Sequence, residues 1–208
     1  ISDIIQDGDN NLWIATEDGG VNIWNREADE INYLRSDVGA VKLNVNNVHA
    51  LFEDEDNSFW IGTFLGGINR YNPKTKQLQV FKKGQEEESA FTNNMIYVIY
   101  KDRKGEVWIG TTGGLHKFNK RKATYESFHP ELFGGRFIYE IFEDSQGEIW
   151  ICLMDADGLY HYNPAQEKFT SIESAGKLRE STGFICAFED SRKQMWFGTV
   201  SQGPVKLD

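Results

Sequence analysis

Apolar residues occur along the chain in short segments that are separated by polar turns. Residues 48–54 (VHALFED) and 59–63 (FWIGT) are rich in apolar and aromatic residues, whereas residues 68–72 (INRYN) alternate apolar with polar positions. A further short segment, LQVF, follows at 78–81. Such lengths and alternation are typical of β-strands, and no stretch of about 11 residues shows the period of an amphipathic helix. We therefore predict an all-β chain.

Turn-forming residues lie between these segments. The sequence EDNS at 55–58 separates the first two segments, Gly66 and Gly67 separate the second from the third, and NPKT at 72–75 precedes the fourth. Glycine adopts positive φ without steric cost, and proline fixes φ and lacks an N–H for strand pairing. Residues 48–81 are thus expected to form four antiparallel strands joined by tight turns.

This four-stranded unit recurs along the chain. Tryptophans mark it at intervals of 47, 48, 42 and 46 residues, and an aspartate stands six residues before each one. The tryptophans are Trp13, Trp60, Trp108, Trp150 and Trp196, and the aspartates are Asp7, Asp54, Asp102, Asp144 and Asp190. We place the repeats at about 1–35, 46–82, 94–129, 136–173 and 183–208, with polar, glycine-containing loops at 36–46, 83–93, 129–135 and 174–182. Four strands in about 40–50 residues are typical of a β-propeller blade.

Packing between the repeats is predicted from three recurring positions. A lone sheet that is apolar on both faces cannot bury both, whereas stacked sheets can. The second residue after each tryptophan is small, which indicates close approach of a neighbouring sheet. These small residues are Ala15, Gly62, Gly110, Cys152 and Gly198. We expect the tryptophans to pack between blades and the aspartates to accept turn N–H groups, so that both are structural residues.

The first repeat has its own first strand, whereas the last repeat lacks a fourth. Repeat one begins with its own first strand, ISDIIQD, and repeat five stops after its third, PVKLD. The predicted fold class is therefore an all-β propeller of four-stranded antiparallel blades, whose five repeats form one domain or fragment, an incomplete part of a larger propeller. Either blade five has an unpaired edge, or flanking sequence completes it. An unpaired edge can pair with another chain, including a second copy.

Composition narrows the classes of partner. The 22 lysines and arginines against 32 acidic residues give a net charge of −10, which disfavours binding to nucleic acid and to anionic membranes. Hydrophobic residues make up 39%, enough for a core, and no apolar run approaches the roughly 20 residues of a membrane span. Cys152 and Cys186 both lie in strand-like sequence, so we expect two buried free thiols rather than a disulfide framework.

Motifs for catalysis, metals or cofactors are absent from the sequence. The four histidines, His49, His116, His129 and His161, do not have the spacing of metal ligands, and no nucleotide-binding or nucleophile motif occurs. Two acidic turns resemble calcium loops weakly but lack the glycine and the bidentate glutamate of such loops. We predict no metal, no cofactor and no catalytic residue.

Candidate ligand-binding residues follow from the position of the repeats. Propeller ligands usually bind near the axis on one face, at the innermost strands and the loops beside them. The fifth residue before the repeated aspartate is variable and is polar or aromatic in three blades: His49, Tyr97 and Tyr139. Glu140 follows Tyr139, and Phe64 and Asp155 lie in turns at the same end of the blades. We predict that these six residues bind a ligand, with Phe64 able to stack on a sugar, although ordinary packing would also explain each aromatic residue.

The repeated phrase resembles the two-component regulator propeller repeat. The likeness is strongest at 96–119 (IYVIYKDRKGEVWIGTTGGLHKFN) and 138–163 (IYEIFEDSQGEIWICLMDADGLYHYN), and it extends over nearly the whole chain. The resemblance implies the periplasmic, N-terminal sensor region of a hybrid histidine kinase, as in gut bacteria that perceive carbohydrates. It also implies propellers of about seven blades, a small-molecule or oligosaccharide ligand, and signalling domains downstream in the same receptor.

Two other classes of function remain open from the sequence. The Asp-x-x-Gly-x-apolar-Trp element resembles the Asp-box turn of sialidases, which would suit a propeller glycosidase or a lyase-like enzyme. Glycoside hydrolysis needs two carboxylates across one sugar, whereas the repeated acids here occupy equivalent turns, and no arginine recurs in register. A lectin or a protein-interaction scaffold would instead present exposed aromatic patches without a central pocket.

Overall fold

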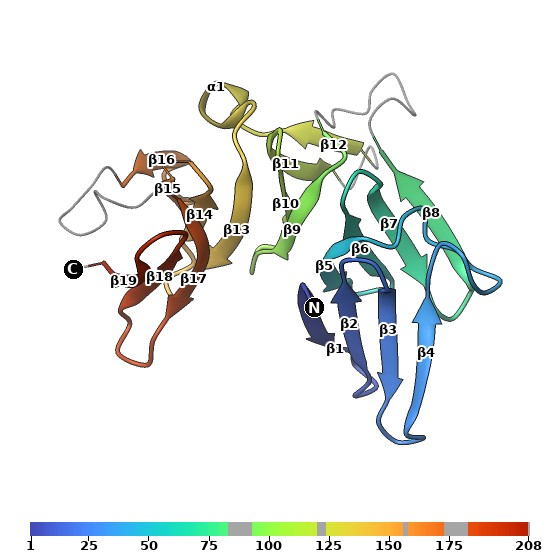
Figure 1. Cartoon of the computed structure of the whole chain (residues 1–208). Helices are drawn as coiled ribbons and strands as arrows, with labels where there is room; N and C mark the ends of the chain where they lie inside the picture. Colours follow the sequence, from blue (N-terminus) through green and yellow to red (C-terminus); the bar gives the residue numbers. More distant parts are fainter. Residues whose placement is uncertain (83–92, 120–123, 156–157, 173–182, 208) are drawn as a thin grey trace. The chain divides into compact units, whose positions relative to one another are not determined.

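The computed structural model describes residues 1–82, 93–119, 124–155, 158–172 and 183–207. Within these residues the chain is all-β apart from one short helix, and it forms four four-stranded sheets and one three-stranded sheet (Figure 1). Each sheet is an antiparallel meander of consecutive strands, so the predicted propeller blades are confirmed. No helix among the described residues is long and apolar enough to cross a membrane.

Each sheet is formed by strands that follow one another along the chain. The first sheet contains β1 (Asp3–Gln6), β2 (Leu12–Thr16), β3 (Gly20–Asn25) and β4 (Glu30–Leu34). The second contains β5 (Val48–Glu53), β6 (Phe59–Thr63), β7 (Gly67–Asn72) and β8 (Gln77–Phe81). The third contains β9 (Ile96–Lys101), β10 (Val107–Thr111), β11 (Gly114–Asn119) and β12 (Thr124–Ser127). The fourth contains β13 (Ile138–Glu143), β14 (Ile149–Leu153), β15 (Leu159–Asn163) and β16 (Lys168–Ser171), and the fifth contains β17 (Phe184–Glu189), β18 (Met195–Thr199) and β19 (Gly203–Lys206).

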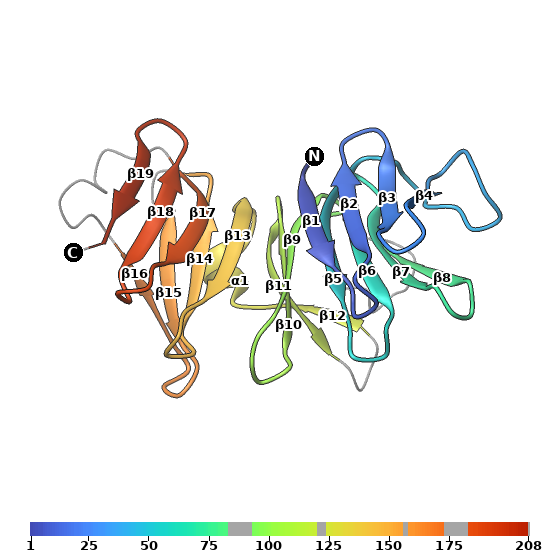
Figure 2. The ribbon, with the colours of Figure 1, turned by 90° about the horizontal axis from the view of Figure 1, so that it is seen from below.

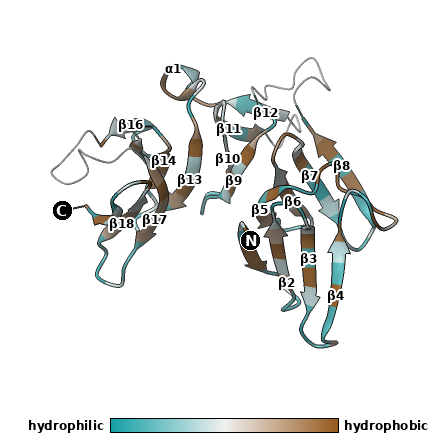
Figure 3. Cartoon of the chain, viewed as in Figure 1, coloured by the Kyte–Doolittle hydropathy of each residue, from teal (hydrophilic) through white to brown (hydrophobic). Residues whose placement is uncertain are grey.

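Burial explains the hydrophobic pattern of the second strand in each blade. Every residue of β6, β10 and β14 is buried, which accounts for their continuous apolar sequences. By contrast, β2 alternates buried with half-buried residues. Figure 3 shows hydrophobic residues concentrated in the strands and hydrophilic residues in the connecting turns. The turn before β7 needs glycine, because Gly67 has φ of +73° and a Cβ there would lie 2.2 Å from the carbonyl oxygen of Phe81.

The repeated aspartate and tryptophan contact each other in every blade. The indole Nε1 donates a hydrogen bond to Oδ2 of the aspartate at 2.9, 3.3, 2.9, 3.0 and 3.0 Å from the first blade to the fifth. In every blade Oδ1 also accepts at least one turn N–H group; in the third it accepts those of Lys104 and Glu106 at 3.0 and 2.8 Å. The aspartate therefore ties the turn to the tryptophan of the next strand.

The described residues fall into two compact units, which are considered separately. The first contains Ile1–Ile99 and Asn119–Glu126, and the second contains Tyr100–Phe118 and Ser127–Asp208. The division runs through the third sheet. The organisation of residues 1–208 as one propeller domain stays a prediction.

The core of the first unit forms between its first two sheets, which lie face to face (Figure 2). The ring of Trp13 stacks on that of Phe59 with centroids 3.5 Å apart and an interplanar angle of 9°. Gly62 allows close approach of the next strand, because a Cβ there would lie 2.7 Å from Cγ2 of Ile96. Large aromatic contacts and a small residue in mid-strand thus set the spacing of the sheets.

The second unit is built in the same way. Trp108 meets Tyr162 edge-on with ring centroids 5.6 Å apart, and Trp150 lies 5.3 Å from Phe197. At Gly198 an added Cβ would meet the Sγ atom of Cys186. The tryptophans of the first four blades are buried, but Trp196 is 36% exposed, so the prediction that each fills a space between blades is wrong there.

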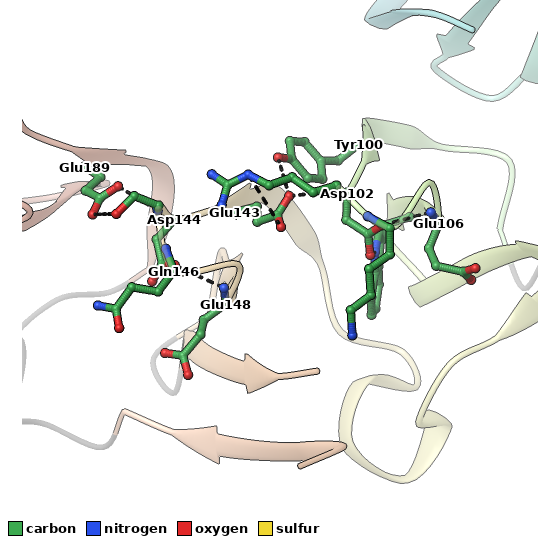
Figure 4. A network of polar contacts seen from close by, with 12 residues as sticks. Tyr100, Asp102, Glu106, Glu143, Asp144, Gln146, Glu148 and Glu189 are labelled. Carbon is green, nitrogen blue, oxygen red and sulfur yellow. Dashed lines mark hydrogen bonds and ion pairs between the residues drawn. The ribbon is translucent and has the colours of Figure 1, made fainter. Parts of the chain in front are cut away.

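Glutamates preceding the repeated aspartates link consecutive blades within each unit. Oε2 of Glu53 accepts the backbone N–H of Gly8 at 3.2 Å. Glu143 accepts that of Arg103 at 2.9 Å, and Glu189 accepts that of Ser145 at 2.7 Å. Figure 4 shows the last two contacts as parts of one polar network. A carboxylate at this position therefore satisfies a turn donor of the preceding blade.

Three details of the structure bear on other expectations. The segment 129–135, expected to be a loop, contains the one-turn helix α1 (Pro130–Phe133), which starts at a proline and buries Phe133. Four residues are too few to show a helical period in the sequence.

The two cysteines differ in exposure. Cys152 is buried as expected, but Cys186 is exposed on edge strand β17, so the prediction of two buried thiols is wrong for Cys186. The fifth sheet has three described strands, as its sequence predicted.

Candidate functional site

Three of the predicted ligand residues come together in the first compact unit. The His49 ring, on β5, lies 4.7 Å from that of Tyr97, on β9, and 5.9 Å from that of Phe64, which follows β6. All three side chains are half-buried. The residues are 48 positions apart at most, yet the blades bring them into one aromatic cluster. We call His49, Phe64 and Tyr97 the aromatic cluster.

The electrostatics of the aromatic cluster favour an uncharged histidine. Partial burial lowers the pKa of His49, and the nearby carboxylate of Glu17, in the turn after β2, opposes this shift. A neutral imidazole has one N–H donor and one nitrogen acceptor. The cluster therefore offers aromatic faces, a neutral polar group and a neighbouring carboxylate.

The other three predicted residues lie in the second compact unit. Tyr139, on β13, has its ring 5.7 Å from that of Phe137. Glu140, beside it, accepts the N–H of Ile141 on one carboxylate oxygen at 3.0 Å. Both side chains are half-buried.

Asp155 forms an ion pair that the sequence did not predict. Its two carboxylate oxygens accept hydrogen bonds from Nε and Nη2 of Arg136 at 2.9 and 2.5 Å. Arg136 Nη1 also donates to the hydroxyl of Tyr160 at 2.7 Å. The charge of Asp155 is thus neutralised within the fold, and a ligand at this point would meet Asp155 and Arg136 as a pair.

A second feature missed from the sequence is a cation opposite the repeated tryptophan. Strand pairing places Arg70, Lys117 and His161 across from the tryptophans of blades two, three and four. The Arg70 guanidinium carbon lies 5.1 Å from the centre of the Trp60 ring, and Lys117 Nζ lies 4.0 Å from that of Trp108. Such contacts are cation–π interactions. The sequence could have indicated these contacts, because the residue that pairs with the repeated tryptophan is basic in three successive blades.

Each of these basic residues also approaches an acid of the adjoining turn. Nη2 of Arg70 lies 2.7 Å from Oδ2 of Asp56, and Nζ of Lys117 lies 4.0 Å from Oε2 of Glu106. In blade four, Nε2 of His161 lies 2.6 Å from Oε2 of Glu148. We call this arrangement of tryptophan, turn acid and basic residue the cation position of a blade.

A surface hollow of about 520 Å³ adjoins the cation position of blade two. Asp56, Ser58 and Arg70 line one part of it, and residues 77–79 of β8 line another. Arg70 is held here by Asp56 and by a 3.0 Å hydrogen bond to the Ser58 hydroxyl. The polar groups at this hollow are therefore largely bonded to one another.

Comparison with solved structures gives close matches in fold. The extracellular domain assigned to the hybrid two-component system BT3049 from B. thetaiotaomicron matches with a TM-score of 0.82 and 22% identity, over 98% of this chain and 26% of that one. The extracellular domain of BT4673 from the same organism matches with a TM-score of 0.78 and 22% identity, over 99% of this chain and 29% of that one. The chain thus spans little more than a quarter of these relatives.

More distant propellers share the fold as well. Virginiamycin B lyase from Staphylococcus aureus matches with a TM-score of 0.68 and 13% identity, over 99% of this chain and 68% of the lyase. A comparison with functionally curated proteins gave no match. At these identities the likeness establishes the fold alone.

The sequence repeats themselves match a family model. The model described as "Two component regulator propeller" matches residues 1–18, 42–64 and 90–113. These segments cover the first and second strands of blades one and two and extend through the first two strands of blade three. Over these three segments the chain is similar to the two-component regulator propeller family.

Proposed function

We propose that this chain is part of the extracytoplasmic, periplasmic sensor region of a hybrid two-component receptor. The family repeats and the fold shared with two extracellular domains of such systems support this proposal. The signalling domains would lie elsewhere in the receptor. A propeller of about seven blades, and pairing with a second copy of the chain at an open sheet edge, belong to the same proposal.

The proposed ligand is a carbohydrate-derived molecule, and the proposed contact is the aromatic cluster. The observation that carries this is the convergence of His49, Phe64 and Tyr97 beside Glu17. Aromatic rings bind the apolar faces of sugars, while a neutral imidazole and a carboxylate can bond to their hydroxyls. Tyr139, Glu140 and Asp155 remain proposed ligand residues of the second unit, with Asp155 acting together with Arg136.

A substitution of the aromatic cluster tests this site. A glycan array first identifies a ligand for the unmodified chain, and titration calorimetry then compares it with the triple variant His49→Ala, Phe64→Ala, Tyr97→Ala. We expect affinity to fall at least tenfold. The control is Tyr33→Ala, which removes an aromatic residue that is 57% exposed on β4. Unchanged affinity in a triple variant with an intact circular dichroism spectrum would reject the site.

Sensing requires that the ligand bind one receptor state more tightly than another. The coupling between sites cannot exceed this difference in affinity. In the full receptor, the identified ligand should change autophosphorylation of the kinase, and the triple variant should not respond. If the ligand binds but kinase output stays constant, the chain is better described as a lectin or a protein-interaction scaffold.

A lyase-like or glycosidase-like enzyme is the second candidate function. The observation in its favour is the fold shared with virginiamycin B lyase. Incubation of the chain with quinupristin, followed by mass spectrometry, tests lyase activity, and a panel of oligosaccharides tests hydrolysis. We expect both substrates to remain intact. Turnover that the triple variant loses would favour the enzyme over the sensor.

A further inference from the structure

Three side chains that can ligate metals meet in blade four. Asp144 follows β13, Glu148 precedes β14 and His161 lies on β15. One ligand atom from each lies within 4.8 Å of the others. Asp144 is 5% exposed, and the side chains of His161 and Glu148 are 20% and 26% exposed. The group is therefore largely enclosed by the fold.

The histidine nitrogen in this group lies at ion-pair distance from a carboxylate but outside hydrogen-bond geometry. His161 Nε2 is buried and lies 2.6 Å from Glu148 Oε2, yet it forms no hydrogen bond. Its ring packs on that of Trp150, with centroids 4.4 Å apart. A buried polar atom without a hydrogen bond is costly, so another partner at this point would stabilise the site.

The equivalent positions in blades two and three show what the site accommodates. There the cation position holds Arg70 and Lys117, whose charges are permanent or nearly so. In blade four an imidazole replaces them, and an imidazole nitrogen is a metal ligand, which a guanidinium is not. The acidic turn still favours a positive charge, and here a metal ion can provide it.

Neighbouring residues orient both carboxylates. Asn163 Nδ2 donates to Oε1 of Glu148 at 2.7 Å, which leaves Oε2 facing His161. Oδ1 of Asp144 accepts two turn N–H groups, and its Oδ2 accepts the Trp150 indole N–H at 3.0 Å. Figure 4 shows Asp144 and Glu148 with this turn. Carboxylates held by such bonds are typical of metal sites, and Oδ2 retains a lone pair for an ion.

We propose that Asp144, Glu148 and His161 bind a divalent transition-metal ion of the zinc class. One imidazole nitrogen and two carboxylate oxygens suit zinc better than calcium or magnesium, which prefer oxygen ligands alone. Bonds of about 2.0–2.2 Å to a tetrahedral ion would space ligand atoms by roughly 3.5 Å. The 2.6 Å distance between His161 Nε2 and Glu148 Oε2 must then open by about 1 Å, which rotation of the Glu148 side chain can supply. This site is independent of the aromatic cluster.

Zinc titration of the chain tests the proposal. After removal of metal with EDTA, calorimetry at pH 7.5 should show one zinc ion bound, and cobalt should give visible absorption bands of a site containing nitrogen and oxygen ligands. We expect His161→Gln and Glu148→Gln each to weaken zinc binding at least tenfold. The matched control is His129→Gln, because His129 Nδ1 also lies 2.6 Å from a carboxylate, that of Glu131.

Circular dichroism without metal establishes that each variant is folded. The proposal is overturned if the folded, unmodified chain binds no zinc. It is also overturned if His161→Gln and Glu148→Gln bind zinc as tightly as the unmodified chain. If only His129→Gln lost zinc binding, the proposal would also be overturned, because zinc would then bind at His129 and Glu131.

Discussion

Oε2 of Glu143 accepts the backbone N–H of Arg103 at 2.9 Å, although the two residues are 40 positions apart in the chain. Glu143 is 8% exposed and also lies 3.3 Å from the hydroxyl of Tyr100. Burial, with the charge of Glu143, raises the pKa of Tyr100 to about 12. The phenol therefore stays protonated and can donate to the carboxylate through the physiological range.

Loss of this carboxylate should destabilise the second unit. Glu143→Ala leaves the Arg103 N–H and the Tyr100 hydroxyl without their acceptor, and we expect a loss of roughly 2 kcal/mol in the free energy of unfolding. Urea denaturation measures it, with Glu30→Ala on exposed β4 as the control, where the change should stay within about 0.5 kcal/mol. Equal effects in the two variants would contradict a role for Glu143 in linking blades.

The repeated aspartate should contribute more to the free energy of unfolding where it is buried. Asp102→Ala removes the acceptor of two turn N–H groups and of the Trp108 indole, and we expect a loss of about 3 kcal/mol. Asp190 makes the same kinds of contact at a half-buried site, so Asp190→Ala should have a smaller effect. Thermal unfolding of both variants compares them. A larger effect at Asp190 would show that burial does not set the strength of this contact.

Filling the space at Gly62 should disturb the packing of blades two and three. Gly62→Ala places a methyl group 2.7 Å from Ile96 Cγ2 and 3.2 Å from the Ala50 Cβ, so we expect a loss of about 1–3 kcal/mol. The matched control is Gly8→Ala, where the nearest heavy atom is 3.9 Å from the new methyl group. Denaturant midpoints measure the difference. If Gly62→Ala is as stable as Gly8→Ala, the sheets do not depend on a small residue there.

His49 should make stability depend on pH in the mildly acidic range. Burial lowers its pKa in the folded chain, so below the unfolded value of about 6.5 the unfolded chain binds more protons. Stability is therefore retained above that pH and falls as the pH drops toward the folded pKa.

Comparison of unfolding at pH 7.5 and pH 5.5 tests this prediction. The decrease in stability should be smaller in His49→Gln than in the unmodified chain, with exposed His129→Gln as the control. An identical decrease in His49→Gln would show that His49 is not responsible.

The sequence by itself determined the blade architecture. The recurring Asp and Trp positions, the strand alternation and the turn residues are local properties, and each blade is a meander of consecutive strands. Four strands joined by short turns leave few alternative pairings, so their order could be predicted. The small residues after the tryptophans likewise indicated where sheets approach closely.

Contacts between residues far apart in sequence were decided by the tertiary structure. The convergence of His49, Phe64 and Tyr97, the pairing of Arg136 with Asp155, and the grouping of Asp144, Glu148 and His161 depend on side-chain direction and on how sheets stack. Side-chain direction and sheet stacking do not follow from the spacing of residues along the chain. The same type of residue can be buried between sheets in one blade, can bond to another side chain in a second, and can be exposed to solvent in a third. For this reason Trp196 is partly exposed whereas the tryptophans of the first four blades are buried, and Cys186 is exposed whereas Cys152 is buried.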